Sequence, residues 1–422
     1  MTNRRDFLKA ATAAASVAAP FPALAKSMKR LGHVVVVGGG YGGATAAKYL
    51  RLWSDGAVEV TLVERNPAFV SCPMSNLVIG GLKQMADITV GYDNLARVHG
   101  VKVVHDTVSA IDPGARKLTL AGGTTLGYDR LVLAPGIDFM LDRVEGLAGH
   151  VDTIPHAWKA GEQTVILRKQ LEAMADGGVF AIHIPKAPYR CPPGPYERAC
   201  LVAAYFKQHK PRSKVIVLDA NDDIQSKKAL FRKAWETHYK DILEYRPNNT
   251  LLEVDVASRS AIMDFETVKA DVLNVIPPQR AGAVAGMIGS DLINGRWINV
   301  DWLTMEVHDV PRVHVVGDAA FPAPTMPKSG HMANQQAKVA AAAIIRLLEG
   351  RPPNPAPVVM NTCYSYVDPK NAVHVASVHQ YDAEKRTFLP VHGAGGLSPA
   401  ANQLEAKTAQ SWAQNIWADM LA

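Results

Sequence analysis

Four consecutive valines, Val34 to Val37, form an uninterrupted apolar run near the start of the chain. β-branched residues without polar alternation predict a strand that is buried on both faces. A glycine-rich turn follows, residues 44–50 predict a helix, and residues 58–64 predict a second strand that ends in an acid. These elements, in this order, predict a parallel-sheet unit that binds a dinucleotide.

The glycines of this turn stand at positions 38, 40 and 43, the spacing of a dinucleotide-binding turn. Gly38 permits the tight turn, Gly40 lets the backbone approach a pyrophosphate, and Gly43 lets the helix pack closely against the strand. Glu64, about 20 residues beyond the last glycine, is placed to bond a ribose hydroxyl. A glycine-rich turn without a ligand is the alternative. We expect the same site to include Arg65, Val108, Ala134 and Gly136.

A second set of alternating elements follows the first. Strands are expected at 101–104, 117–120 and 126–136, then a helix after 163–167, a strand at 177–184, a helix at 197–206 and a strand at 214–219. The later elements repeat the order of the first unit, which predicts a second domain of the same kind.

The turn of this second unit differs from that of the first. Residues 185–195 contain five prolines and bulky side chains where glycines would stand. Such residues cannot let a pyrophosphate approach the backbone. The second unit therefore predicts a nicotinamide-binding fold that does not bind nicotinamide.

The chain then returns to the first domain. Residues 312–319 predict a strand that closes in Gly-Asp, and an alanine-rich helix is expected from His331 to about residue 349. A proline-rich linker over 351–357 separates these elements from the last 65 or so residues, which we expect to form a smaller unit.

Composition places the chain among folded globular proteins. Its 422 residues give room for two or three domains, with 48% hydrophobic and 20% charged residues. The body of the chain has no run of about 18 apolar residues, so no membrane span is expected. The formal charge of +6 is spread along the chain without a dense Lys/Arg cluster, which argues against nucleic-acid binding.

The N-terminus has the pattern of a targeting segment. Arg4 and Arg5 form a twin-arginine pair, an alanine-rich run follows, and residues 23–25 read Ala-Leu-Ala, a cleavage signal. A basic amphipathic helix is the alternative. A signal peptide over residues 1–25 predicts export to the periplasm, where disulfides persist.

The chain has four cysteines. Cys72 follows the strand that ends at Glu64, Cys191 lies in the proline-rich turn, and Cys363 comes from the last unit. Two structural disulfides would be the ordinary expectation for an exported protein. A pair in the cofactor cleft would instead be a redox group. Cys200, on an apolar helix, is expected to be a small buried residue.

Three motifs together resemble the two-dinucleotide-domain flavoproteins of the glutathione reductase superfamily: residues 38–43 with Glu64, residues 128–136 and residues 313–318. Within it, the chain is similar to the flavoprotein subunits of flavocytochrome c sulfide dehydrogenase over nearly its whole mature length. Cys72 in its loop, residues 191–198, residues 328–334 and the unit around Cys363 carry this resemblance.

The resemblance implies an α/β fold with two Rossmann-like domains of the glutathione reductase type and a small C-terminal α+β domain. The implied boundaries are 31–149 with 275–350 for a discontinuous FAD-binding domain, 150–274 for a degenerate NAD-binding-like domain, and 358–422 for a flavin-covering domain. It also implies covalent FAD on Cys72, a redox disulfide between Cys191 and Cys363, and a c-type cytochrome partner. This chain has no C-x-x-C-H motif, so the haem subunit would be encoded separately.

Hydrosulfide suits this chemistry, because a small nucleophile attacks a disulfide by thiol–disulfide exchange. Glu197 is a candidate proton carrier, or an ordinary carboxylate at a helix start. The helix beginning near His331, preceded by Gly330, would point its positive end at the flavin pyrimidine. Asp318 would accept a hydrogen bond from a ribityl hydroxyl. The histidines show no metal-binding spacing, so no metal is expected.

Three functions compete. The first is a sulfide-oxidising flavoenzyme that delivers electrons to a cytochrome. The second is a sulfide:quinone oxidoreductase, against which export and the lack of an apolar amphipathic C-terminal helix argue. The third is a flavin-binding accessory protein without catalytic activity.

Overall fold

The computed structural model describes residues 30–422, so the expected signal peptide lies outside the described residues. The valine run forms β1 (Gly32–Val37), which pairs in parallel with β2 (Val58–Val63) on one side and β9 (Arg130–Leu133) on the other. The sheet continues through β22 (Val310–Val315), which pairs with β9. The six strands run in the order β21-β22-β9-β1-β2-β5, with β21 at Glu306–Val307 and β5 at Lys102–Val104.

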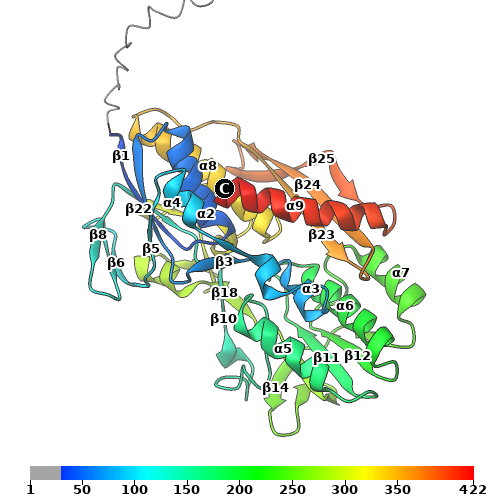
Figure 1. The fold of residues 1–422 in the computed structure, drawn as a ribbon. Coiled ribbons are helices and arrows are strands. Elements are labelled where there is room, and N and C mark those ends of the chain that lie inside the picture. The colour runs from blue at the N-terminus through cyan, green and yellow to red at the C-terminus, as the bar shows by residue number, and fades with distance from the viewer. Residues whose placement is uncertain (1–29) are drawn as a thin grey trace, which may run out of the picture. The chain divides into compact units, whose positions relative to one another are not determined.

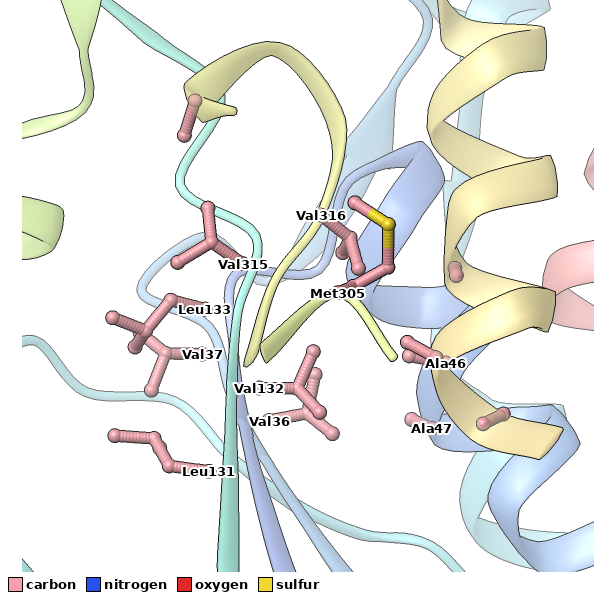
Figure 2. Packing of buried hydrophobic residues seen from close by; sticks show 14 of the residues in the cluster. Val36, Val37, Ala46, Ala47, Leu131, Val132, Leu133, Met305, Val315 and Val316 are labelled. Atoms are coloured by element: carbon pink, nitrogen blue, oxygen red, sulfur yellow. The ribbon is translucent and has the colours of Figure 1, made fainter. Parts of the chain in front are cut away.

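Both faces of this sheet are buried, as the valine run predicts. Helices α2 (Tyr41–Trp53) and α8 (Gly330–Leu348) pack against each other and cover one face. Figure 2 shows Val36 and Val132 pointing toward the helix that carries Ala46, whereas Leu133 points away from it. Small alanine side chains let the helices approach the strands closely.

A second parallel sheet has the order β13-β12-β11-β17, with strands β11 (Val179–Ile184), β12 (Lys214–Asp219), β13 (Leu243–Arg246) and β17 (Val272–Val275). Its helices are α5 (Glu162–Ala173), α6 (Gly194–His209) and α7 (Lys228–His238). The α6 helix begins three residues before the expected position 197, because Pro195 lacks an N–H and fits the first turn without losing a bond.

The C-terminal residues form an antiparallel sheet and a helix. The strands are β23 (Val358–Tyr366), β24 (Ala372–Asp382) and β25 (Thr387–Leu397), and α9 (Gln403–Leu421) packs on them and on α2 (Figure 1). One face of α9, which includes Ile416, Met420 and Leu421, is buried against these neighbours, whereas Leu404 near its start is exposed. Within residues 30–422, no helix is both long and apolar enough to cross a membrane.

Smaller elements connect these sheets. They are β3 (Ala68–Val70), α3 (Ser75–Ile79), β4 (Thr89–Gly91), α4 (Asp93–Arg97), β6 (Val108–Asp112), β7 (Lys117–Leu120), β8 (Thr125–Gly127), β10 (Ile137–Phe139), β14 (Leu251–Asp255), β15 (Ser260–Met263), β16 (Thr267–Lys269), β18 (Gln279–Ala281), β19 (Leu292–Ile293), β20 (Trp297–Ile298) and the short 3₁₀ turns at Met85–Ile88, Leu141–Arg143, Ala283–Ile288 and Gly317–Ala319. The α/β fold class with two parallel sheets and a C-terminal α+β region is confirmed. The domain boundaries stay a prediction, since Leu31–Ala422 pack as one compact unit.

Candidate functional site

A cavity of about 870 Å³ lies where the two parallel sheets and the C-terminal unit meet. Parts of the chain that are far apart in sequence line it. They include residues 38–42, 72–77, 106–108, 134–138, 157–161, 190–191, 197–198, 317–318, 329–331, 362–364 and 412. Fifteen site residues were expected in one cleft, and all of them except Gly43 line this cavity.

The glycine turn has the geometry that a dinucleotide needs. Gly38 has a φ of +99°, and a Cβ there would lie 2.5 Å from the carbonyl oxygen of Ala134. A Cβ on Gly43 would lie 1.7 Å from the carbonyl oxygen of Gly38, so only glycine allows this helix to sit so close to the strand. A Cβ on Gly40 meets no described atom within 4 Å, and its backbone faces the cavity.

The acid at the end of β2 is bound to the same turn. Glu64 accepts a hydrogen bond from the Gly39 N–H at 2.6 Å and from the Asn66 N–H at 2.8 Å. A carboxylate has lone pairs beyond those two, so a ribose hydroxyl can still bind it. Arg65 is exposed at the cavity rim, Val108 is buried in its wall, and both line it. Gly136, with a φ of +65°, lines it beside Ala134.

Asp318 supports a bound cofactor most directly. It follows β22 and lines the cavity, and its buried Oδ1 has no hydrogen-bond partner among the described residues. Burial raises the pKa of this carboxyl. A buried polar atom without a partner is costly, and a hydroxyl donor in the cavity would satisfy it. The unpartnered carboxylate oxygen of Asp318 and the open backbone at Gly40 therefore fit FAD.

The N-terminus of α8 opens on the cavity. Ser329 caps the helix by accepting from the Met332 N–H at 3.0 Å, and Gly330 and His331 line the cavity. His331 Nδ1 accepts from the Thr362 N–H at 2.9 Å, and burial lowers the pKa of this ring to about 4. The helix thus presents its positive dipole end, with a neutral imidazole, to whatever fills this part of the cavity.

The two cysteines predicted to form a redox pair lie together. Cys191 and Cys363 are hydrogen-bonded to each other, and all four cysteines of the chain are free thiols in this structure. The hydrogen bond from Cys191, with the ammonium of Lys227, lowers the pKa of Cys363 to about 6. The same contact and burial raise the pKa of Cys191. One sulfur of the pair therefore readily holds a negative charge.

Glu197 lies beside this pair on the first turn of α6. Its side chain is buried, with Oε1 accepting from the Tyr366 N–H at 2.7 Å and Oε2 accepting from Asn76 Nδ2 at 2.8 Å. Burial raises the pKa of this carboxyl to about 7. A carboxyl that titrates near neutral pH beside a thiol pair can exchange protons with it, which favours the proton-carrier interpretation.

Cys72 is far from Cys363 in sequence, yet both residues line the same cavity. Its Sγ accepts from the Ala160 N–H at 3.1 Å and from Arg190 Nη2 at 3.4 Å, and it also donates to the Trp158 carbonyl at 3.3 Å. These contacts hold the Cys72 sulfur in one position within the cavity wall. Its covalent bond to flavin stays a prediction.

Sequence reasoning missed four polar residues of this site: Asn76, Arg190, Arg198 and Lys227. Arg198 is buried and donates to Asn76 Oδ1 at 3.0 Å, while its guanidinium stacks on the Trp158 ring at 4.8 Å. Arg198 stands directly after Glu197, so a second charge at the start of an apolar helix was the available signal. No local pattern in the sequence indicates a role for Lys227, because its hydrogen-bond partner Ser365 lies far along the chain on strand β23.

The acid at the end of the second sheet is occupied by contacts within the protein. Asp219, the acid at the end of β12, accepts from the Tyr196 hydroxyl at 2.7 Å and from the Tyr245 hydroxyl at 3.1 Å. It is fully buried, and burial raises the pKa of its carboxyl. The residue that would bind a ribose is therefore already satisfied, in agreement with the proline-rich turn.

Cys200 is buried on α6, away from the cavity lining. Its Sγ accepts from the Trp235 indole N–H at 3.2 Å, and burial raises the pKa of the thiol. It is the small buried residue that the apolar helix predicts. Residues 30–422 contain no group of three His, Cys, Asp or Glu side chains placed to hold a metal ion.

Three family models match the chain. Residues 32–169 match pyridine nucleotide-disulphide oxidoreductases, residues 164–277 match the central part of the sulfide dehydrogenase (flavocytochrome c) flavoprotein chain, and residues 355–421 match the flavin-binding part of flavocytochrome c sulphide dehydrogenase. The last range contains Cys363 and the whole of α9.

Sequence relatives point to the same group of sulfide-oxidising flavoproteins. The chain is 64% identical over 46 residues to the flavoprotein chain of sulfide dehydrogenase (flavocytochrome c) from Chlorobaculum thiosulfatiphilum, a match covering 94% of that sequence and 11% of this chain. It is 26% identical over 308 residues to the mitochondrial sulfide:quinone oxidoreductase of Dictyostelium discoideum, covering 70% of this chain and 67% of that protein. The match to the mouse protein of the same name is 24% identical and covers 65% of it.

Solved structures show the same fold. The sulfide:quinone oxidoreductase from the hyperthermophilic bacterium Aquifex aeolicus superposes with a TM-score of 0.75 at 18% identity, over 92% of this chain and 91% of that one. Putidaredoxin reductase, in its covalent complex with putidaredoxin, superposes with a TM-score of 0.66 at 17% identity, over 91% and 93% of the two chains.

Proposed function

This chain belongs to the family of flavoprotein chains of flavocytochrome c sulfide dehydrogenase, which are oxidoreductases, and we propose that it oxidises hydrosulfide in the periplasm and passes electrons singly to a c-type cytochrome. The observation that supports this most is the contact between Cys191 and Cys363 at one end of a cavity whose residues fit FAD.

The cysteine pair performs the first step. With the pair as a disulfide, the sulfur of hydrosulfide attacks one cysteine sulfur, and the S–S bond breaks. The bonding electron pair leaves on the second sulfur, so the products are a cysteine persulfide and a thiolate. The hydrosulfide proton stays on the persulfide until a base removes it. Glu197, buried beside the pair with a pKa of about 7, is that base.

The remaining residues hold the cofactor and its charge. FAD, when bound, supplies an acceptor that takes two electrons from sulfur and releases them one at a time. Gly40 leaves room for the pyrophosphate, Asp318 accepts from a hydroxyl of the cofactor, and the α8 N-terminus favours negative charge. The Ala160 N–H and Arg190 orient Cys72 for a thioether bond to the flavin.

Anaerobic addition of sulfide to the purified protein tests this function. Sulfide should bleach the flavin absorption, whereas NADH and NADPH should not, because the proline-rich turn over residues 185–195 keeps a pyrophosphate from the backbone and Asp219 already accepts hydrogen bonds from two tyrosines. Bleaching by NADH would contradict this expectation. A flavin that sulfide leaves oxidised would favour the accessory-protein alternative.

The electron acceptor requires a separate experiment. Expression in the native host and gentle purification should yield a haem protein that co-elutes with this chain and is reduced when sulfide is added. A stable complex should bury at least roughly 1,000 Å² in total. The likeness to sulfide:quinone oxidoreductases supplies the competing outcome: a flavoprotein that elutes alone and reduces only quinone analogues.

A further inference from the structure

A buried lysine that the proposed steps do not use lies next to the cysteine pair. Lys227 is only 4% exposed, and its ammonium donates a hydrogen bond to Ser365 Oγ at 2.8 Å. Among the described residues it makes no ion pair with a carboxylate. Its backbone also has a φ of +57°, which is strained for a residue with a side chain. A buried charge at a strained position requires compensation from its surroundings.

Strand β23 provides the compensation. Alternate residues of a strand share a face, so Ser365 and Cys363 point to the same side, about 7 Å apart along the strand. The ammonium that bonds Ser365 therefore lies on the face of β23 that carries Cys363, and the two groups interact through their charges. The negative charge of Cys363 is the largest influence that raises the pKa of Lys227 against burial, followed by Glu197, Cys191 and, from α9, Glu405.

Each neighbouring element contributes a titratable group to this cluster. The turn before α6 supplies Cys191, α6 supplies Glu197, the start of α7 supplies Lys227, and α9 supplies Glu405. From α8, His331 contacts the Thr362 N–H next to Cys363, and burial keeps this ring neutral. Two cations face the cluster: Lys227, and Arg198 of α6, whose buried guanidinium interacts with Cys191 and Glu197. Lys227 is the one whose charge acts on Cys363.

We propose that Lys227 is the counter-ion of the redox pair, a positioning residue whose ammonium holds one sulfur of the reduced pair as a thiolate. The Cys191 thiol donates to Cys363, so the reduced pair keeps a single shared proton. The proposal rests on the proposed function, because it concerns the same cysteines. A thiolate is the form of cysteine that reacts, so a neutral side chain at 227 would leave a smaller share of the reduced pair as thiolate and would slow its reaction.

The test measures the protonation of Cys363 without requiring turnover. The holoprotein is reduced with dithiothreitol, pulsed briefly with iodoacetamide over a range of pH, and the labelled Cys363 peptide is quantified by mass spectrometry. The midpoint of Cys363 labelling against pH should lie near pH 6 in the wild type. In Lys227→Met, which keeps the apolar stem, the midpoint should rise by at least about one unit, which is about a tenfold loss of labelling at pH values below both midpoints.

Two further variants separate charge from structure. Ser365→Ala removes the hydrogen bond and keeps the ammonium, so it should shift the midpoint less than Lys227→Met does. Lys227→Arg keeps a cation, so its midpoint of Cys363 labelling should lie closer to that of the wild type. A Lys227→Met profile that coincides with the wild type would overturn the proposal.

A wild-type midpoint near that of a free thiol, about 8.5, would overturn it even if the methionine variant does not fold. This outcome is independent of the sulfide assay. A protein whose flavin ignores sulfide but whose Cys363 titrates as expected would contradict the proposed function and leave the role of Lys227 standing.

Discussion

Burial, more than helix position, determines the chemistry of Glu197. A carboxylate in the first turn of an exposed helix would be solvated and would interact only with the helix dipole. Glu197 is instead 6% exposed, and both of its oxygens accept hydrogen bonds. Because burial raises its pKa to about 7, the group changes protonation in the range where a sulfide-oxidising enzyme would work.

Replacing this carboxyl should remove a pH dependence. A base acts in its deprotonated form, so the rate of sulfide-driven flavin reduction in the wild type should rise with pH through about 7. Glu197→Gln should lower the rate, taken per hydrosulfide anion present at each pH, by about a hundredfold and abolish that inflection. Stopped-flow reduction over a range of pH measures both effects. The fold should lose only about 1 kcal/mol, since the Tyr366 N–H keeps an acceptor.

Asp219→Asn is the matched control for this variant, because Asp219 is also buried and hydrogen-bonded but lies away from the cavity. It should leave the inflection in place. An inflection that survives in Glu197→Gln would assign the proton transfer to another group.

Cys72 is expected to hold the flavin covalently. Acid precipitation of the wild type should leave the flavin on the protein, whereas Cys72→Ala should release it into the supernatant, where its absorbance is measured. Cys200→Ala serves as the control, because Cys200 is buried away from the cavity and should not affect attachment. Complete release of flavin from the wild type would show that the bond does not exist.

Among the secondary-structure elements, the turn between β1 and α2 shows two distinct uses of glycine. At Gly43 a side chain would collide with the Gly38 carbonyl, a backbone group that cannot move aside without displacing β1. At Gly40 a side chain would meet open space in the structure but would stand where the pyrophosphate is expected. The first glycine therefore serves packing, and the second serves binding.

This difference predicts opposite outcomes for two alanine variants. Gly43→Ala should yield little folded protein, because the predicted Cβ contact of 1.7 Å forces the helix off the strand. Gly40→Ala should fold, with a thermal midpoint near that of the flavin-free wild type, but should bind much less FAD. Circular dichroism and the flavin-to-protein absorbance ratio distinguish the two. Equal flavin content in Gly40→Ala and wild type would place the pyrophosphate elsewhere.

For the molecule as a whole, four buried histidines make the folded state sensitive to acid. Burial lowers the pKa of His156 to about 3 and the pKa values of His183, His314 and His331 to about 4. The unfolded chain takes up these protons near pH 6.5, whereas the folded chain does not until far lower pH. Their contribution to stability is therefore complete above about pH 6.5 and is lost as the pH falls toward 4.

The free energy of unfolding should consequently decrease steadily between about pH 6.5 and pH 4. His183 is the most suitable residue for a test, since it lies on β11 in the interior and outside the cavity. In His183→Leu the free energy of unfolding should decrease over this pH range by up to about 3 kcal/mol less than in the wild type. This is the value of a shift of two to three pKa units. Urea unfolding at several pH values measures this. A variant with the wild-type pH dependence would assign the acid sensitivity to other groups.

Much of this molecule follows from local pattern in the sequence. The valine run, the glycine spacing and Glu64 depend on backbone conformation and on contacts between neighbouring elements, so they could be recognised in order along the chain. The same holds for the proline-rich turn after β11, because proline acts on its own backbone. The apolar helix that buries Cys200 also needed no distant contact to be recognised.

Only the tertiary structure decided how the distant parts combine. Strand β23 brings Cys363 and Ser365 against α6 and the start of α7, and this contact turns Glu197 into a buried acid and Lys227 into the neighbour of a thiolate. Protonation depends on burial and on charges within a few ångströms, and those neighbours lie more than a hundred residues away along the chain. The sequence determined which chemical groups were available, and the packing of three separate segments around one cavity determined their charge.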